Sequence, residues 1–216
     1  MKTLKGLAIT DCRFSTGMLS TWQGRLVFAL SQPSYWQWEE DGSVVIHCIG
    51  IGGGLEGAEN FSQAVAREAI EEASVPVDLR EPPGGATLYL SPTEQLQTIS
   101  GPWSDSTPAP LFLWQKQWIV CKPGKEPYFR TWFTPVYWGE FAAEPQASME
   151  NMAIIQVPPE LFPNLLQPRL LTELEKEGLI LQGHDLPARD KIKIGLSGTA
   201  YYLAECWDQL QDLIQF

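Results

Sequence analysis

The sequence predicts an α/β fold: an α/β/α sandwich built on a mixed β-sheet, with additional helices near the C-terminus. The first observation behind this prediction is that apolar and β-branched runs lie on both sides of one amphipathic segment, residues 61–73. The second is that further helix-like segments follow residue 159. With 216 residues, 44% of them hydrophobic, the chain is long enough for one full domain. We expect a single domain over residues 1–216, with 159–216 as a helical extension packed on it.

The strands are expected in two groups around the amphipathic segment. Before it, apolar and aromatic runs predict strands at 24–32, 35–39 and 43–51, and Asp41-Gly42 predicts a hairpin between the last two. After it, strands are expected at 75–79, 86–91, 95–100, 111–120, 128–141 and 152–157. A loop at 101–110 and a turn at 122–125 separate some of these strands. The C-terminal helices are expected to begin near Pro158, Pro168 and Thr199.

Composition excludes several classes of protein. The net charge of −11 argues against a general nucleic-acid binder, which needs a basic surface. No apolar run approaches the ~18 residues of a membrane span, and the N-terminal apolar run is too short for a secretory signal. The cysteines are scattered without a C-x-x-C pair, which favours free thiols over a disulfide framework or a zinc site. We expect a cytoplasmic protein that binds neither nucleic acid nor membrane; a homodimer is compatible with the sequence.

The segment 61–73 is predicted to be a helix with two different sides. Asn60 is a suitable N-cap, and Pro76 ends the helix. At about 100° per residue, one side is expected to pack on the sheet through its apolar residues. These are Phe61, Val65, Ala66, Ala69, Ile70 and Ala73. The other side gathers Glu68, Glu71 and Glu72, since residues three and four apart on a helix are neighbours.

Three neighbouring glutamates raise the question of what offsets their charge. Like charges on adjacent turns repel by a few tenths of a kcal/mol per pair, so helix stability does not favour this pattern. A hard divalent cation such as Mg²⁺ would reverse that balance, because it binds through carboxylate oxygens and keeps positions open for phosphate oxygens. The competing interpretation is an ordinary solvated acidic face. His47, inside the strand expected at 43–51, has no nearby metal-binding partner in the sequence and is assigned no role.

The spacing around this helix resembles a known family signature. Gly53, five residues, Glu59, seven residues, Arg67-Glu68, two residues and Glu71-Glu72 together resemble the signature box of the Nudix hydrolases. Two positions depart from the family pattern: Ser74 stands where glycine is usual, and Ala69 replaces a bulky aliphatic residue. Serine in a left-handed helix cap costs roughly 1 kcal/mol or shifts the path of the chain. Neither departure removes a carboxylate.

The resemblance implies a Nudix-like fold and a reaction. The implied activity is Mg²⁺-dependent hydrolysis, with Mn²⁺ as a substitute, of a pyrophosphate bond in a small-molecule nucleotide, a nucleoside diphosphate linked to another moiety. By the same resemblance, the metal ligands are Glu68, Glu71, Glu72 and the carbonyl of Gly52. Glu68 is the expected general base, although some family members place the base on a later loop. Glu59 and Arg67 are expected to pair and to hold the loop against the helix.

Three points stay open in the sequence. Glu140, Glu144 and Glu150 follow the last long strand, and Glu150 is a weak candidate for an additional ligand or substrate-binding residue. Substrate recognition is expected in loops at 82–125 and in the C-terminal helices. The alternative functions are a non-catalytic Nudix-like sensor of a nucleotide derivative and a structural or interaction protein with a chance motif.

Overall fold

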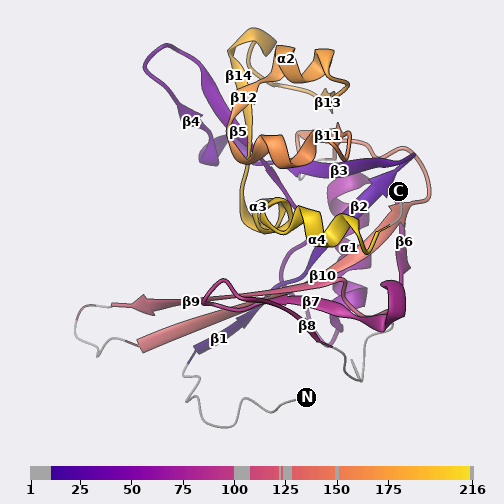
Figure 1. The fold of residues 1–216 in the computed structure, drawn as a ribbon. Coiled ribbons are helices and arrows are strands. Elements are labelled where there is room, and N and C mark those ends of the chain that lie inside the picture. The colour runs from indigo at the N-terminus through magenta and orange to yellow at the C-terminus, as the bar shows by residue number, and fades with distance from the viewer. Residues whose placement is uncertain (1–10, 100–107, 122, 124–127, 149–150, 215–216) are drawn as a thin grey trace.

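A large mixed sheet dominates the computed structural model, which describes residues 11–99, 108–121, 123, 128–148 and 151–214 (Figure 1). The described residues form fourteen strands, ordered β12-β14-β5-β3-β2-β10-β9-β7-β8 along the main path. The sheet contains parallel pairs, such as β10 with β2 and β14 with β5, and antiparallel pairs, such as β2 with β3. The strands are β1 Asp11–Phe14, β2 Gly17–Trp22, β3 Arg25–Leu30, β4 Gln37–Trp38, β5 Val44–Ile49, β6 Val77–Arg80, β7 Thr87–Leu90, β8 Leu96–Ile99, β9 Phe112–Val120, β10 Tyr128–Phe141, β11 Ala153–Val157, β12 Arg169–Leu170, β13 Ile180–Gly183 and β14 Ile192–Leu196.

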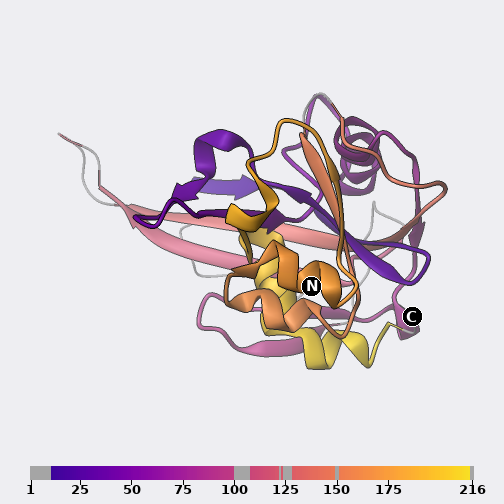
Figure 2. The ribbon, with the colours of Figure 1, turned by 90° about the horizontal axis from the view of Figure 1, so that it is seen from above.

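Helices cover both faces of this sheet, which confirms the predicted α/β class. They are α1 Phe61–Ala73, α2 Leu171–Lys176, α3 Gly198–Glu205 and α4 Trp207–Gln211. Along β3, Val27 and Ala29 join the apolar cluster under α1, whereas Phe28 and Leu30 join the larger cluster under α2, α3 and α4. This alternation is the period of two that a strand imposes when both of its faces are buried. Seen from above, α1 and the yellow helices α3 and α4 lie on opposite sides of the strands (Figure 2).

Most of the predicted strands are present. The Asp41-Gly42 hairpin is confirmed, because β4 pairs antiparallel with β5 and Gly42 has a φ of 79°. The long pair β9 and β10 is also confirmed, although most of the turn predicted at 122–125 and of the loop at 101–110 lies outside the described residues. The sequence did not single out the central strand β2, because Gly17–Trp22 is almost wholly buried and shows no alternation.

The C-terminal segment differs most from its prediction. Residues 159–216 were expected to be helical, yet they also contribute β12, β13 and β14, and β14 extends the sheet beside β5. Ile192, Ile194 and Leu196 are buried at every second position, which suits a strand and not a helix. The last helix, expected to run from Thr199 to the end, is divided at Cys206 into α3 and α4. In the part of the chain described here, no helix is long and apolar enough to span a membrane.

Helix α1 begins and ends where the sequence predicts. Asn60 is the N-cap: its side chain accepts a 2.9 Å hydrogen bond from the backbone N–H of Gln63. The Gln63 side chain accepts in return from the backbone N–H of Asn60, at 2.9 Å, which completes a capping box. Ser74 ends the helix in the left-handed conformation, with φ of 59°. The chain therefore keeps the left-handed exit that glycine usually provides, and it does so at the cost of strain at a serine.

The buried face of α1 is rotated from the predicted one. Ile70 was expected to pack on the sheet, but its side chain is 55% exposed. Ala64 and Glu68 are buried in its place. At about 100° per residue, Ile70 lies half a turn away from Phe61, so the two cannot share one face. The correction has a functional consequence, because the inward face of the helix carries a glutamate and not only apolar residues.

Candidate functional site

The loop between β5 and α1 is held close to the start of β2. The backbone N–H of Thr16 donates to the Gly53 carbonyl at 2.8 Å, and Ser15 forms a β-bridge with Gly54. Gly52 has a φ of 144°, and a Cβ at this position would lie 2.3 Å from the Thr16 carbonyl oxygen. Only glycine fits such a contact. The need for glycine's backbone freedom therefore falls on Gly52, one residue before the first glycine of the motif.

Two glutamates of α1 contact consecutive glycines of this loop. A Cβ on Gly53 would meet a carboxylate oxygen of Glu68 at 2.2 Å, so the absence of a side chain here makes room for that carboxylate. The backbone N–H of Gly52 donates to Oε2 of Glu72 at 2.9 Å. Glu68 is buried, with 8% of its surface exposed. The loop thus provides space for one carboxylate and a hydrogen-bond donor for another.

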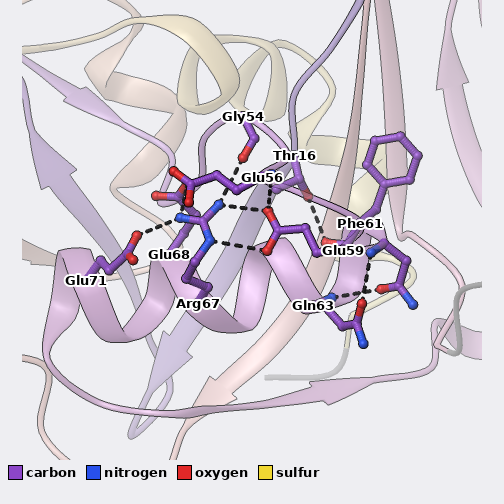
Figure 3. A network of polar contacts seen from close by, with 10 residues as sticks. Thr16, Gly54, Glu56, Glu59, Phe61, Gln63, Arg67, Glu68 and Glu71 are labelled. Carbon is purple, nitrogen blue, oxygen red and sulfur yellow. Dashed lines mark hydrogen bonds and ion pairs between the residues drawn. The ribbon is translucent and has the colours of Figure 1, made fainter.

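The guanidinium of Arg67 connects the loop to the acids of the helix (Figure 3). Its Nε and Nη2 donate to the two carboxylate oxygens of Glu59, at 3.2 and 3.0 Å, and Nη2 also donates to the Gly54 carbonyl at 2.9 Å. Nη1 reaches Glu68 at 2.9 Å and Glu71 at 2.6 Å. The contact expected between Glu59 and Arg67 is therefore present. Arginine suits this position because its planar fork can bind several carboxylates at once. We call Glu59, Arg67, Glu68, Glu71 and Glu72 the acidic cluster.

The charges of the acidic cluster stabilise the ionised forms of its members. Hydrogen bonding to Arg67 is the main cause that lowers the pKa of Glu59, and the backbone N–H of Glu56, 2.6 Å away, adds to it. Hydrogen bonds to Glu59, Glu71 and Glu68 in turn raise the pKa of Arg67 well above its usual range. Three carboxylates nevertheless share one guanidinium, and Glu72 adds a further carboxylate to the cluster, so the cluster carries an excess of negative charge.

The donor set of the cluster suits a hard divalent cation, since it consists of carboxylate oxygens beside backbone carbonyls. The predicted ligands are not drawn together into one site: no group of three or more His, Cys, Asp or Glu side chains with metal-binding geometry occurs among the described residues. Instead Nη1 of Arg67 binds both Glu68 and Glu71, and Gly52 binds Glu72. Helical spacing makes the three acids neighbours, but each side chain turns toward its nearest donor. Their role as metal ligands stays a prediction.

The later acids have other contacts. Glu140, on β10, forms an ion pair with Arg80 of β6. Glu144 accepts a 2.6 Å hydrogen bond from the side chain of Gln182. Neither contact involves the acidic cluster. The weak candidate Glu150 lies outside the described residues.

A cavity of about 550 Å³ adjoins the acidic cluster at Glu72. Its other walls come from segments far apart in the sequence, and they include Tyr35, Gln37, His47, Asn151 and Ser197. Burial lowers the pKa of His47, because desolvation disfavours the charged imidazolium. No sequence pattern indicated this cavity, because its lining residues follow no motif. His47, which was assigned no role, contributes to its wall.

Comparisons with known proteins add a structural resemblance. No family model matches the sequence, and no significant match occurs among curated proteins. Among solved structures, a Nudix-family hydrolase from Clostridium perfringens is 14% identical, with a TM-score of 0.43 over 71% of this chain and 86% of its own. An ADP-ribose pyrophosphatase from Streptococcus suis is 13% identical, with a TM-score of 0.40 over 91% and 90% of the two chains. A MutT protein from Methanosarcina mazei is 14% identical, with a TM-score of 0.40 over 94% of each chain.

The resemblance to the Nudix hydrolases is carried by the spacing of the sequence motif around α1.

Proposed function

We propose that the chain is a divalent-cation-dependent pyrophosphohydrolase of the Nudix type. Its substrate is a nucleoside diphosphate linked to another moiety, such as a nucleotide sugar, a dinucleotide or a nucleoside triphosphate. The observation that carries this proposal is the network of Arg67, whose one guanidinium contacts Glu59, Glu68 and Glu71 together. A salt bridge that served stability alone would need one carboxylate, whereas this network gathers more acids than it neutralises.

The excess of acids has a chemical use. Phosphate oxygens are negatively charged, and they repel both the acidic cluster and an attacking water. A bound Mg²⁺ or Mn²⁺ would offset the charge on the phosphate oxygens and lower the pKa of a coordinated water. Glu68, Glu71, Glu72 and the Gly52 carbonyl are the groups that would hold the cation.

The residues around the acids have positioning roles in this proposal. Glu59 and the Gly54 carbonyl fix Arg67, and Arg67 orients Glu68 and Glu71. A rigid surrounding shell keeps closely spaced carboxylates directed at one point. Glu68, which lies buried against Gly53, is the proposed general base that accepts a proton from water. A base on a later loop is the alternative.

The remaining proposals concern the cellular setting. A small-molecule nucleotide is the proposed partner, and the net charge of −11 disfavours nucleic acid. We propose a cytoplasmic location and a single domain over residues 1–216 with 159–216 packed on it. A homodimer remains compatible with this function.

Turnover of defined substrates tests the proposal. The purified protein is incubated with ADP-ribose, dinucleotides, nucleotide sugars and nucleoside triphosphates, with and without Mg²⁺, and the release of nucleoside monophosphate or phosphate is measured. We expect Mg²⁺-dependent hydrolysis that falls by about 100-fold or more in Glu68→Gln and Glu72→Gln. Glu160→Gln, which changes an exposed acid outside the cluster, is the matched control.

Two outcomes would decide against this function. If Glu68→Gln and Glu72→Gln both keep their activity, the site has been assigned to the wrong residues. If the wild-type protein binds a nucleotide tightly and hydrolyses none of the compounds, the chain is a sensor. The observation that favours this second candidate is that the acids of the cluster do not converge into a metal-binding group among the described residues.

A further inference from the structure

The polar cavity, defined as the space beside Glu72 lined also by Tyr35, Gln37, His47, Asn151 and Ser197, is of a size suited to a small ligand. Its volume of about 550 Å³ lies within the roughly 300–1,000 Å³ range of small-molecule pockets. Because Glu72 also accepts a hydrogen bond from Gly52, the cavity and the acidic cluster share this residue. A molecule that occupied the cavity would therefore extend directly to the acids of α1.

The walls of the cavity favour an uncharged ligand. Neither Lys nor Arg occurs among the described residues that line it, and Glu72 brings negative charge. A phosphate group placed against these walls would meet no compensating cation. The hydroxyl and amide groups of Ser197, Gln37 and Asn151 offer hydrogen bonds to neutral polar groups instead. The lining thus suits the part of a nucleotide that carries no charge, which is the base and its sugar.

Asn151 supplies an independent observation. The residue is 3% exposed, and its side-chain Nδ2 is buried without a hydrogen-bond partner among the described residues. Its backbone is held in place, since its N–H donates to Ser148 Oγ at 3.2 Å and its carbonyl accepts from the Ser148 N–H at 3.0 Å. A buried donor without a partner costs free energy, and native proteins keep few of them. The nitrogen is closed off from solvent in this conformation, but Asn151 lines the cavity, so a turn of the amide would present Nδ2 to an acceptor atom of a ligand there.

Tyr35 lies on the same cavity in a different environment. It belongs to the short 3-10 helix η1, Pro33–Tyr35, and 70% of its surface is exposed although it contributes to the lining. An exposed aromatic ring on a pocket wall is available for stacking with a flat base, an interaction worth about 1–3 kcal/mol per base.

From the lining, Asn151 and Tyr35 together, we infer that the polar cavity is a nucleoside-binding subsite. It takes the base and sugar of the substrate, with Asn151 donating a hydrogen bond to an acceptor on the nucleoside and Tyr35 stacking on the base. This inference rests on the proposed function for its choice of a nucleotide, and it adds where the uncharged half of that nucleotide binds.

Binding of free nucleosides tests the subsite without any hydrolysis. Adenosine, guanosine, cytidine and uridine are titrated separately into metal-free protein at millimolar concentrations, and binding is followed by NMR. We expect at least one nucleoside to bind the wild-type protein. Its affinity should fall by about 10-fold in Asn151→Ala and in Asn151→Asp, because neither side chain retains the donor. Tyr35→Ala should cause a similar loss, and Tyr35→Phe should restore most of the affinity.

Matched controls separate the subsite from general damage. Asn164→Ala removes an exposed asparagine from η3, Phe162–Leu166, and Trp38→Ala removes a 63% exposed aromatic residue that does not line the cavity. Both should bind nucleoside as the wild type does. Tyr35 is a surface residue, so its variants test the inference even if the changes at Asn151 reduce folding. The inference is overturned if no nucleoside binds, or if the Tyr35 and Asn151 variants that fold bind as tightly as the wild type.

The same variants distinguish this inference from the proposed function. With a hydrolysed substrate, Asn151→Ala and Tyr35→Ala should raise KM by about 10-fold with a much smaller change in kcat, whereas Glu72→Gln should lower kcat. If the protein hydrolyses a substrate and both Asn151→Ala and Tyr35→Ala keep the wild-type KM, the nucleoside subsite is refuted and the proposed hydrolase activity stands. If the two variants weaken nucleoside binding and the wild-type protein hydrolyses none of the compounds, the proposed hydrolase activity is refuted and the nucleoside subsite stands.

Discussion

The acidic cluster and the polar cavity lie side by side, and they differ in the charge of the groups that form them. In the cluster, Arg67 forms ion pairs with Glu59, Glu68 and Glu71 and donates to the Gly54 carbonyl, and Glu72 accepts from the Gly52 backbone N–H. In the cavity, most lining groups are uncharged amides, hydroxyls and aromatic rings. Glu72 belongs to both. The first region suits a cation and the phosphates it would accompany, and the second suits a neutral ligand.

The two regions also differ in how many of their hydrogen-bond donors have partners. Arg67 makes hydrogen bonds through Nε, Nη1 and Nη2, so the cluster is organised before any ligand arrives. Asn151, on the cavity, keeps a buried donor without a partner among the residues described. Preorganised charges support chemistry because they need no rearrangement during the reaction, whereas unsatisfied polar groups support selectivity because only a matching ligand can satisfy them. The difference suggests that reaction and recognition are divided between neighbouring surfaces.

The contrast between the two regions predicts that metal affinity depends on the cluster, and the largest loss of metal affinity is expected when Arg67 is replaced. Arg67→Ala removes the only guanidinium of the cluster and leaves Glu68, Glu71 and Glu59 to repel one another. We expect the affinity for Mn²⁺, measured by electron paramagnetic resonance, to fall by about 10- to 100-fold, as for other residues that orient metal ligands. Arg67→Lys should recover only part of this loss, because lysine lacks the planar fork.

A surface ion pair provides the control for Arg67. Arg169→Ala breaks the paired contacts of Arg169 with Glu177, 3.0 and 2.5 Å long, which lie outside the cluster. This variant should bind Mn²⁺ as the wild type does. If Arg67→Ala also keeps its affinity, Arg67 does not position the acids.

A smaller loss of Mn²⁺ affinity is expected when Gly53 of the loop is replaced, and its neighbour Gly54 provides the control. A Cβ at Gly53 would lie 2.2 Å from a carboxylate oxygen of Glu68, whereas a Cβ at Gly54 would meet nothing within 4 Å. Gly53→Ala should therefore displace Glu68 and lower Mn²⁺ affinity by about 10-fold. Gly54→Ala, one residue away, should have little effect. Equal effects of the two substitutions would contradict the close contact between Gly53 and Glu68.

The smallest effect concerns the end of α1 and should leave both regions unchanged. Ser74 adopts a left-handed conformation with φ of 59°, which glycine tolerates better than serine. Ser74→Gly should raise the free energy of unfolding by roughly 0.5–1 kcal/mol, measured by thermal or denaturant unfolding. Mn²⁺ and nucleoside binding should not change. A loss of stability would show that Ser74 makes a contact that outweighs its strain.

Helix α1 shows how far local sequence information reaches. Its limits at Phe61 and Ala73 and its cap at Asn60 were predicted, because each depends on residues a few positions apart. The contact between Glu59 and Arg67 was expected from the resemblance to the Nudix signature, and it is present. The orientation of the helix was predicted less well. Ile70 is exposed and Glu68 is buried, since the sheet and the loop select which face turns inward. Periodicity describes the faces of a helix, and packing decides between them.

The strands after residue 159 show where local information ends. Ile192, Ile194 and Leu196 alternate as a strand requires, but the run is only five residues long and its pairing partner lies far away in the sequence. Its partner is β5, which precedes it by more than a hundred residues in the sequence. Such pairing depends on chain closure over long distances, and no local pattern records it.

The sequence by itself determined the acidic helix, its caps, the spacing that resembles the Nudix signature and the α/β class, because these depend on neighbours along the chain. Only the tertiary structure decided that Gly52 must approach Thr16, that Glu68 turns inward against Gly53, and that a cavity opens beside Glu72. Tyr35, His47 and Asn151 come together there from distant segments. Contacts between distant segments follow from how the sheet and helices pack, so the acids of the proposed reaction could be identified in the sequence, and the surface proposed for recognition could not.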